Sequence, residues 1–492
     1  MRDIDALIVG TGFSGLAAAI KLQERGTTFT ILERGDAIGG TWRDNTYPGC
    51  RCDVPSHLYS FSFAPNPEWS ELYSPQPEIK AYLQKVAEDH DLVRHVRFGT
   101  PMTDAEWDEA AQRWVVQTRE GPITGRFLIL GNGPLSEPAF PDIEGLDGFE
   151  GPVLHTARWD HSVDLTGQRV AVVGTGASAV QVLPHVQRAA SDVILFQRTP
   201  AWILPHPNRR ITDRERRVFR RFPLVQKAMR AILYGIAEIG ALGLTRRPPL
   251  TNVMKKVALK YLDHEVSDPE KRRMLTPDYQ PGCKRLLPSK DFLAAVDQPN
   301  VTLVPHGLTQ VDGNAVVLAD GTRHEVDVII LGTGFRVTDN PAMQLLTGKD
   351  GATVAQVWKE IGMGAHLGST VPGFPNMVFL AGPNTGIGHT SLVVMIEAQL
   401  RYLMGALDEL DRRGASTFEV RPSAYDVSNQ DVQRRMQKTV WNTGGCQSWY
   451  LDDKGRNPTL WPDFTFRFIQ KTRRFDAESY TYRSAPTPTA TR

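Results

Sequence analysis

Cysteine is scarce in this sequence, which has four cysteines (Cys50, Cys52, Cys283 and Cys446) among 492 residues. So few cysteines in so long a chain cannot build a disulfide framework, which excludes a small disulfide-stapled secreted scaffold. We therefore expect reduced cysteines and a cytoplasmic protein. The N-terminal "DALIVG" is already strand-like, so a signal peptide is not expected.

An excess of charge of one sign is also missing, since 56 basic residues face 55 acidic ones and the net charge is +1. No field that attracts polyanions is implied, so a nucleic-acid partner is not expected. Even the arginine-rich "RRITDRERRVFRRF" is interpreted as a solvated helix face. No metal site is expected either.

Long apolar runs are absent as well. The most membrane-like stretch, Ile232 to Leu244, contains Glu238 and covers about 13 residues, whereas a spanning helix needs about 20 apolar ones. We expect a buried or interfacial helix there and no stable membrane insertion. A chain of this length is nevertheless long enough for several domains with a sizeable core.

What the sequence does have is a dinucleotide-binding pattern at its start. An apolar strand "ALIVG" leads into Gly10, Gly12 and Gly15 in the GxGxxG spacing, with Phe13 opening a helix, and a second strand ends on Glu33. The first glycine makes a tight turn, the second lets the backbone approach a pyrophosphate, and the third lets the helix pack on the strand. An acid about 20 residues after the turn suits a free ribose, as in FAD.

The pattern recurs later in the chain without its acid. "RVAVVG" leads into a turn and helix start at Gly174, Gly176, Ala177, Ser178 and Ala179. The next strand, "DVILF", is followed by Gln197 at the position of the acid and then by Arg198 and Thr199. Without a carboxylate, a 2′-phosphate is not repelled, and a guanidinium binds one. This second site therefore predicts NADPH. The alternative is that Arg198 is a solvated charge after a strand.

Together the two motifs predict an α/β fold with two Rossmann-like domains, one for FAD and one for NADPH, in which hydride passes from nicotinamide to flavin. A disulfide reductase would pass the electrons to a cysteine pair. Cys50 and Cys52 are separated by one residue and point to opposite sides of an extended chain, so a bridge between them is not expected.

Five segments make an oxygenase the favoured interpretation: "GGTWRDNTYPGCRCD" from Gly39, "VIILGTGF", "FLAGPNTGIGHTS", "CQSWY", and the pattern Phe149, Gly151, His155, Trp159 and Asp160. They resemble the fingerprints of class B flavoprotein monooxygenases, and specifically the FxGxxxHxxxW pattern of the type I Baeyer–Villiger monooxygenase family. The resemblance covers almost the whole chain. Related enzymes that oxygenate nitrogen or sulfur usually have Tyr or Phe where Trp159 stands.

The resemblance implies an NADPH- and O2-dependent monooxygenase that converts ketones to esters or lactones through a C4a-peroxyflavin, with sulfoxidation as a side activity. It implies Arg285 as the active-site arginine and Asp53 as its partner. An arginine suits the role because it stays protonated and can stabilise a negative charge. The alternative for Arg285 is a solvated loop cation.

Further site residues follow from motif position. Thr41, Trp42, Asp53 and Tyr59 are expected to contact the flavin and Met102 to cover the adenine, while Lys284 would join Arg198 on the 2′-phosphate. Gly444 and Gly445 suggest a mobile lid that lays Trp449 over NADP. Two core tryptophans around a glycine turn are the alternative. His155 and Trp159 are interpreted as anchors at a hinge between domains, not as catalytic acid and base.

The expected organisation has six parts: an FAD-binding domain over 1–138, an NADPH-binding domain over 139–207, a helical insertion over 208–282, the rest of the NADPH-binding domain over 283–339, the rest of the FAD-binding domain over 340–480, and a disordered tail over 481–492. "FTFRF" near Phe464 is expected to be a short strand.

Two other functions remain open at this stage: a flavin-containing monooxygenase that oxygenates nitrogen or sulfur, and a redox-silent nucleotide-binding protein. The expected partners are a small ketone and O2, in a monomer or weak homodimer. The identity of the ketone does not follow from the sequence.

Overall fold

The first of two large sheets is built mainly from the N-terminal third of the chain, in a computed structural model that describes residues 4–485. Its strand order is β17-β4-β5-β6-β1-β2-β3, and β18 pairs with β6. The pairs β4–β5 and β5–β6 are antiparallel and the other neighbours are parallel. Its strands are β1 (Ile4–Val9), β2 (Phe29–Leu32), β3 (Val96–Arg97), β4 (Asp104–Asp108), β5 (Arg113–Gln117), β6 (Ile123–Leu130), β17 (Leu346–Thr347) and β18 (Met377–Phe379).

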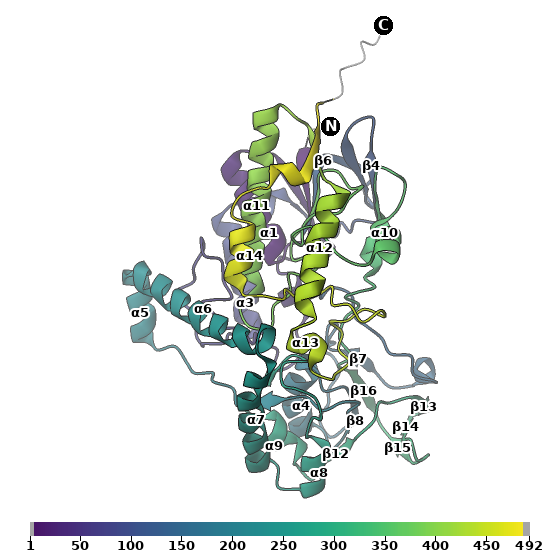
Figure 1. Cartoon of the computed structure of the whole chain (residues 1–492). Helices are drawn as coiled ribbons and strands as arrows, with labels where there is room; N and C mark the ends of the chain where they lie inside the picture. The colour runs from purple at the N-terminus through teal and green to yellow at the C-terminus, as the bar shows by residue number, and fades with distance from the viewer. Residues whose placement is uncertain (1–3, 486–492) are drawn as a thin grey trace.

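The second sheet is parallel throughout, with the order β12-β9-β8-β16-β7. Its strands are β7 (Val153–His155), β8 (Arg169–Val173), β9 (Asp192–Phe196), β12 (Val301–Val304) and β16 (Val328–Leu331). Nearly continuous apolar strands such as "RVAVV" are typical of parallel sheets covered on both faces. The fold is therefore α/β with two Rossmann-like units, and Figure 1 shows them one above the other.

Helices cover both sheets. In the first unit α1 (Phe13–Arg25) lies against α3 (Gln76–Asp89) and the long α11 (Leu392–Arg413), and in the second α4 (Ala177–Ala189) packs on α9 (Phe292–Val296). The remaining helices of the first unit and of the segment between the units are α2 (Thr41–Asp44), α10 (Val354–Ile361), α12 (Pro422–Met436), α13 (Val440–Thr443) and α14 (Thr465–Lys471). In Figure 1, α13 lies where the two units meet.

A helical segment leaves the second unit and returns to it. It comprises α5 (Asp213–Arg221), α6 (Pro223–Thr245), α7 (Asn252–Glu265) and α8 (Pro269–Met274). Small sheets complete the fold: β10 (Ile203–Leu204) with β11 (Leu287–Pro288), the hairpins of β13 (Gln310–Asp312), β14 (Ala315–Val317) and β15 (Arg323–Glu325), and β19 (Thr417–Val420) with β20 (Tyr480–Arg483).

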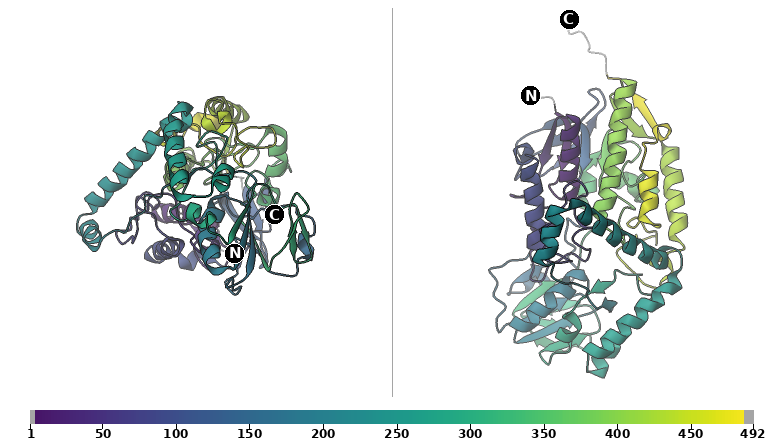
Figure 2. Two further views of the ribbon diagram at one scale, coloured as in Figure 1. Left: turned by 90° about the horizontal axis from the view of Figure 1, so that it is seen from below. Right: turned by 90° about the vertical axis from the view of Figure 1, so that its left-hand side faces the viewer.

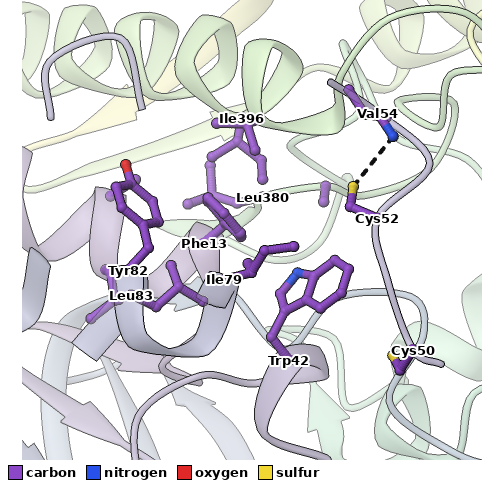
Figure 3. Close-up of a cluster of buried hydrophobic side chains, with 14 of the residues drawn as sticks. Phe13, Trp42, Cys50, Cys52, Val54, Ile79, Tyr82, Leu83, Leu380 and Ile396 are labelled. Carbon is purple, nitrogen blue, oxygen red and sulfur yellow. Dashed lines mark hydrogen bonds between the residues drawn. The ribbon is translucent and has the colours of Figure 1, made fainter. Parts of the chain in front are cut away.

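The first glycine motif shows why its residues are needed. Gly10 adopts φ +98°, and a Cβ on Gly15 would lie 1.8 Å from the Gly10 carbonyl oxygen. Phe13 begins α1, and its ring packs edge-on against Tyr59 with centroids 4.9 Å apart. Phe13 thus belongs to the core cluster of Figure 3, together with Tyr82 and Leu380.

Two expectations near the C-terminus are wrong. "FTFRF" is the start of helix α14, because Phe468 is buried against neighbouring helices and Glu238 accepts hydrogen bonds from the amides of Thr465 and Phe466 at the first turn. The tail does not begin at residue 481, because β20 runs to Arg483 in register with β19 and buries Tyr480. Residues 486–492 of the expected tail lie outside the described residues.

The apolar segment around Ile232 is also longer than expected. It forms the 23-residue helix α6, which is long and apolar enough to cross a membrane by length and composition. Only 22% of its most apolar window is buried. The helix is therefore longer than the roughly 13 residues expected, and most of its apolar surface is not buried in the core.

Candidate active site

A cavity of about 1010 Å³ separates the two units and collects most of the expected site residues. Thr41, Trp42, Asp53 and Tyr59 line it from the first unit. From the second unit and the returning loops come Gly174, Gly176, Ala177, Ser178, Arg198, Thr199, Lys284, Arg285 and Trp449. Gly10, Gly12, Phe13, Gly15, Glu33, Met102 and Ala179 are not part of this lining.

Both glycine turns open into helices that lack a side-chain cap. Gly12 precedes α1 and Gly176 precedes α4, and in neither case does a side chain accept a hydrogen bond from the first turn or an acid occupy it. Free backbone N–H groups and the helix dipole make such N-termini favourable for phosphate. Ala179 closes the second turn, at the position that Gly15 has in the first.

Glu33 is buried at the end of β2 and already engaged by the protein. Its carboxylate accepts hydrogen bonds from the Thr11 amide at 2.9 Å, the Thr11 hydroxyl at 2.6 Å and the Gly35 amide at 2.8 Å, and forms an ion pair with Arg43. Burial opposes ionisation, but these donors outweigh it and lower the pKa of Glu33. The carboxylate is therefore ionised, and its contact with a ribose stays a prediction.

The pair formed by Arg285 and Asp53 lies in the cavity. Arg285 donates from Nε to Oδ2 of Asp53 at 2.5 Å and from Nη2 to Oδ1 at 2.6 Å. The Asp53 charge raises the pKa of Arg285, although burial acts in the opposite direction. Burial alone would raise the pKa of Asp53, but the Arg285 charge and its hydrogen bonds outweigh burial and lower that pKa. Nη1 of Arg285 has no hydrogen-bond partner among residues 4–485, so two N–H groups remain available to the cavity.

A second cationic pair, Arg198 and Lys284, lies further along the same wall. Burial and the nearby Arg198 charge both lower the pKa of Lys284. The Asp278 charge opposes this shift only in part. Two cations held close together repel each other, and an anion between them would relieve that cost. Gln197, at the position of the missing acid, is buried and donates to the Met274 carbonyl at 2.9 Å.

Of the two lid tryptophans, only Trp449 lines the cavity. It is 46% exposed and contacts Tyr450 with ring centroids 4.5 Å apart, whereas Trp441 is buried in a cluster with Leu244 and Val440. The core interpretation therefore holds for Trp441 and not for Trp449. Tyr450, which the sequence reasoning did not select, lines the cavity near Arg285, and burial raises its pKa to about 12.

The expectation that no disulfide forms is wrong. Cys283 and Cys446 are joined by a disulfide although 163 residues separate them. Counting cysteines cannot reveal a contact that only the tertiary structure creates. The bond ties the segment before Lys284 and Arg285 to the lid segment before Trp449.

Cys50 and Cys52 are free and buried, as expected for residues that form no redox pair. Burial raises the pKa of the Cys50 thiol to about 12 and that of Cys52 well above its usual range. Neither thiol is a thiolate at neutral pH, so neither is a nucleophile.

The FxGxxxHxxxW segment reaches the second sheet through β7, which pairs with β16. A Cβ on Gly151 would lie 2.3 Å from the Asp327 carbonyl oxygen, so only glycine fits there. Phe149 and His155 are buried and Trp159 is partly buried against the main core. His155 Nδ1 accepts from the Ala157 amide at 3.0 Å, and burial lowers the His155 pKa to about 4.

The low pKa of His155 predicts a pH-dependent contribution to stability. Unfolded histidine binds a proton below about pH 6.5 while the folded ring resists it, so the free energy of unfolding falls as pH falls. For His155 the loss between pH 7 and pH 5 is about 2 kcal/mol. Urea unfolding of the wild type and of His155→Asn at both pH values measures it: the difference between the two proteins shifts by this amount, and a constant difference contradicts a buried neutral ring.

Contacts between the two units include residues that the sequence reasoning missed. The Tyr47 hydroxyl donates to Gln181 Oε1 of α4 at 2.8 Å, and Gln181 Nε2 donates to the Arg51 carbonyl at 3.1 Å. No local motif marks these residues, because the contact joins segments about 130 residues apart.

Known proteins resemble this chain over nearly its full length. A family model described as pyridine nucleotide-disulphide oxidoreductase matches residues 7–220. A Baeyer-Villiger monooxygenase of Streptomyces coelicolor is 48% identical and covers 97% of this chain and 93% of its own length, and one of Pseudomonas aeruginosa is 45% identical with 99% and 92% covered.

The solved structures agree. An oxidized steroid monooxygenase bound to NADP has a TM-score of 0.86 at 30% identity, with 98% of this chain and 100% of that chain covered. A closed structure of cyclohexanone monooxygenase has a TM-score of 0.85 at 27% identity, with 99% and 100% covered. By the extent of these matches, the chain belongs to the Baeyer–Villiger monooxygenases.

Proposed function

We propose that this enzyme uses FAD, NADPH and O2 to convert ketones to esters or lactones, with sulfoxidation as a side activity. The observation that carries the proposal is the Arg285–Asp53 pair, whose free guanidinium edge opens into the cavity between the two units. Solved relatives are described as complexes with FAD and NADP, which supports the same cofactors here.

The residues present fit both cofactors. The uncapped turn at Gly10, Gly12 and Gly15 would hold the FAD pyrophosphate, with Glu33 at the ribose, and the turn at Gly174 would hold that of NADPH. Thr41, Trp42 and Tyr59 would hold the flavin ring, and Trp42 is oriented by its Nε1 hydrogen bond to the Tyr59 hydroxyl at 3.1 Å. Met102 is half-buried beside the first sheet and would cover the adenine. When bound, the cofactors supply hydride transfer and O2 activation.

Arg285 is the proposed catalytic residue. Its charge persists at any working pH, and its Nη1 group would donate to the oxygen on which negative charge develops. Asp53 acts through Arg285 as a positioning residue, since two parallel hydrogen bonds fix the plane of the guanidinium. Closure of the lid over the cavity would exclude water, which would otherwise divert the activated oxygen to hydrogen peroxide.

The remaining roles complete the proposal. Arg198, Thr199 and Lys284 would bind the 2′-phosphate end of NADPH, and Trp449 would close over the nicotinamide. Phe149, Gly151, His155 and Trp159 would anchor the connection along which the two units move. The domain boundaries given above, apart from the tail, and a cytoplasmic location, where NADPH is supplied, remain part of the proposal.

The Cys283–Cys446 disulfide predicts that NADPH consumption is tightly coupled to ester formation. It holds the lid next to Lys284 and Arg285, so the Cys446→Ser variant should close less completely and release more hydrogen peroxide per NADPH, by about two- to tenfold. Peroxide and ester are measured together, with Val427→Ser as a control, because Val427 is exposed on α12 and does not line the cavity. Equal peroxide yields in the wild type and in Cys446→Ser would show that the disulfide does not govern closure.

A product panel tests the proposed function itself. The holoenzyme is incubated with NADPH and, separately, with phenylacetone, cyclohexanone and a thioether, and the products are identified by mass. We expect ester or lactone from at least one ketone. Sulfoxide without any ester would favour the nitrogen- and sulfur-oxygenating alternative. A protein that stays colourless after FAD is added would favour the redox-silent alternative.

A further inference from the structure

Helix α6 exposes a strip of apolar side chains that nothing in the described part of the chain covers. Ile232 is 58% exposed, Ile236 62% and Ile239 73%. In the left view of Figure 2, α5 and α6 extend away from the rest of the molecule as an arm. A strip of this kind on a soluble protein usually marks an interaction surface.

The strip follows the helical repeat. We define it as the apolar strip, with the members Val225, Ala228, Ile232, Ile236, Ile239 and Leu242, three or four residues apart. Val253 and Val257 of the neighbouring α7 are 66% and 44% exposed. Exposed apolar side chains therefore continue beyond a single helix.

The opposite side of α6 is fixed to the protein. Arg230 donates to the carbonyls of His57 at 2.8 Å and Ser60 at 2.7 Å, and Gln226 is buried beside them. At the C-terminal end, Glu238 caps α14 and Leu244 packs with Trp441. These contacts hold α6 in place as a supported surface, and removing them to span a bilayer would leave buried polar groups unpaired.

The charges around the strip are mostly basic. Residues 216–262 contain eleven lysines and arginines and one acid, the buried Glu238, although the whole chain has a net charge of only +1. The exposed acids Asp213 and Asp263 lie just outside this range. Arg221 and Arg247 lie beyond the two ends of α6, and Lys227, Lys256 and Lys260 are exposed beside the strip. None of these five has an acidic partner among residues 4–485.

The charge around the strip distinguishes between two binding partners, a second copy of this chain and an anionic lipid surface. A second copy of this chain would bring two strongly basic segments together, which opposes association. An anionic lipid surface satisfies both features, because apolar side chains enter the acyl boundary while lysine and arginine contact the headgroups. We propose that α6, with the exposed side of α7, docks the enzyme peripherally on an anionic lipid bilayer.

Co-sedimentation of the holoenzyme with vesicles tests this. Vesicles of phosphatidylcholine alone are compared with vesicles made of equal amounts of phosphatidylcholine and phosphatidylglycerol. Both are tested at low and high salt. We expect binding to the anionic vesicles that weakens with salt, and a loss of at least about tenfold in the Ile236→Glu, Ile239→Glu double variant. Val427→Glu changes a 69% exposed valine on α12 and serves as the matched control, which should bind like the wild type.

Turnover of a water-soluble ketone should be equal in all three proteins, which shows that the variants fold and keeps this test separate from that of the proposed function. Absence of vesicle binding would overturn the proposal. So would equal binding to neutral and anionic vesicles, or a wild-type dimer in light scattering that the double variant dissociates while no vesicles bind.

Discussion

Replacing Arg285 by alanine is expected to lower ester formation by about 10² to 10³ while NADPH still bleaches the flavin absorbance. The guanidinium is the permanent cation that Asp53 holds at the cavity, and its role comes after hydride transfer. NADPH should still be consumed, with the oxygen released as hydrogen peroxide. Rapid-mixing absorbance, peroxide yield and product mass separate the two half-reactions.

Loss of Arg285 leaves the Asp53 carboxylate without its partner, which can destabilise the fold. The effect on stability is therefore measured separately from the effect on activity. An Arg285→Gln, Asp53→Asn double variant removes both charges and preserves hydrogen bonding, and its thermal midpoint should stay closer to that of the wild type than the midpoint of Arg285→Ala. Arg285→Lys keeps the charge but loses the two-pronged contact, so partial activity is expected. If Arg285→Ala forms ester at the wild-type rate, the assigned role is wrong.

Replacing both Arg198 and Lys284 by alanine should raise the KM for NADPH by about 10² or more and leave the KM for NADH nearly unchanged. The two cations face the same part of the cavity, where burial and Arg198 lower the Lys284 pKa. Each charge-assisted contact to a phosphate contributes about 1.5 to 3 kcal/mol. Steady-state kinetics with both nucleotides measure the change in preference.

Arg323→Ala is the matched control for that experiment, because Arg323 pairs with Asp312 on a hairpin of the same unit and does not line the cavity. It should leave both KM values unchanged. Equal losses for NADPH and NADH in the double variant would show that Arg198 and Lys284 do not recognise the 2′-phosphate.

The two nucleotide units were predictable because their signals are local. Gly10, Gly15 and Gly174 fall in turns whose geometry requires them, between a strand and a helix that the apolar pattern already indicates. Such signals need only neighbouring residues. The fold class and the order of the two units therefore follow from short windows of sequence.

The site itself depends on contacts across long stretches of chain. Asp53 and Arg285 are 232 residues apart, and their pairing was expected only through the resemblance to a family. No such guide existed for the Cys283–Cys446 disulfide or for the Tyr47–Gln181 contact. Spacing in the sequence does not encode these distances.

Two local patterns misled for physical reasons. "FTFRF" alternates apolar and polar residues over too few positions to separate a strand from a helix, and Glu238, far away in sequence, caps the helix that forms. Glu238 also made the apolar run look interrupted, whereas its carboxylate turns inward and α6 continues past it.

The most direct test of the proposed reaction is to supply isotopically labelled O2 with NADPH and a ketone and to determine the mass of the product by mass spectrometry. One labelled oxygen atom in the ester, with one NADPH consumed per ester, is the predicted result. An ester without label, or labelled sulfoxide from a thioether with no ester from any ketone, would contradict it.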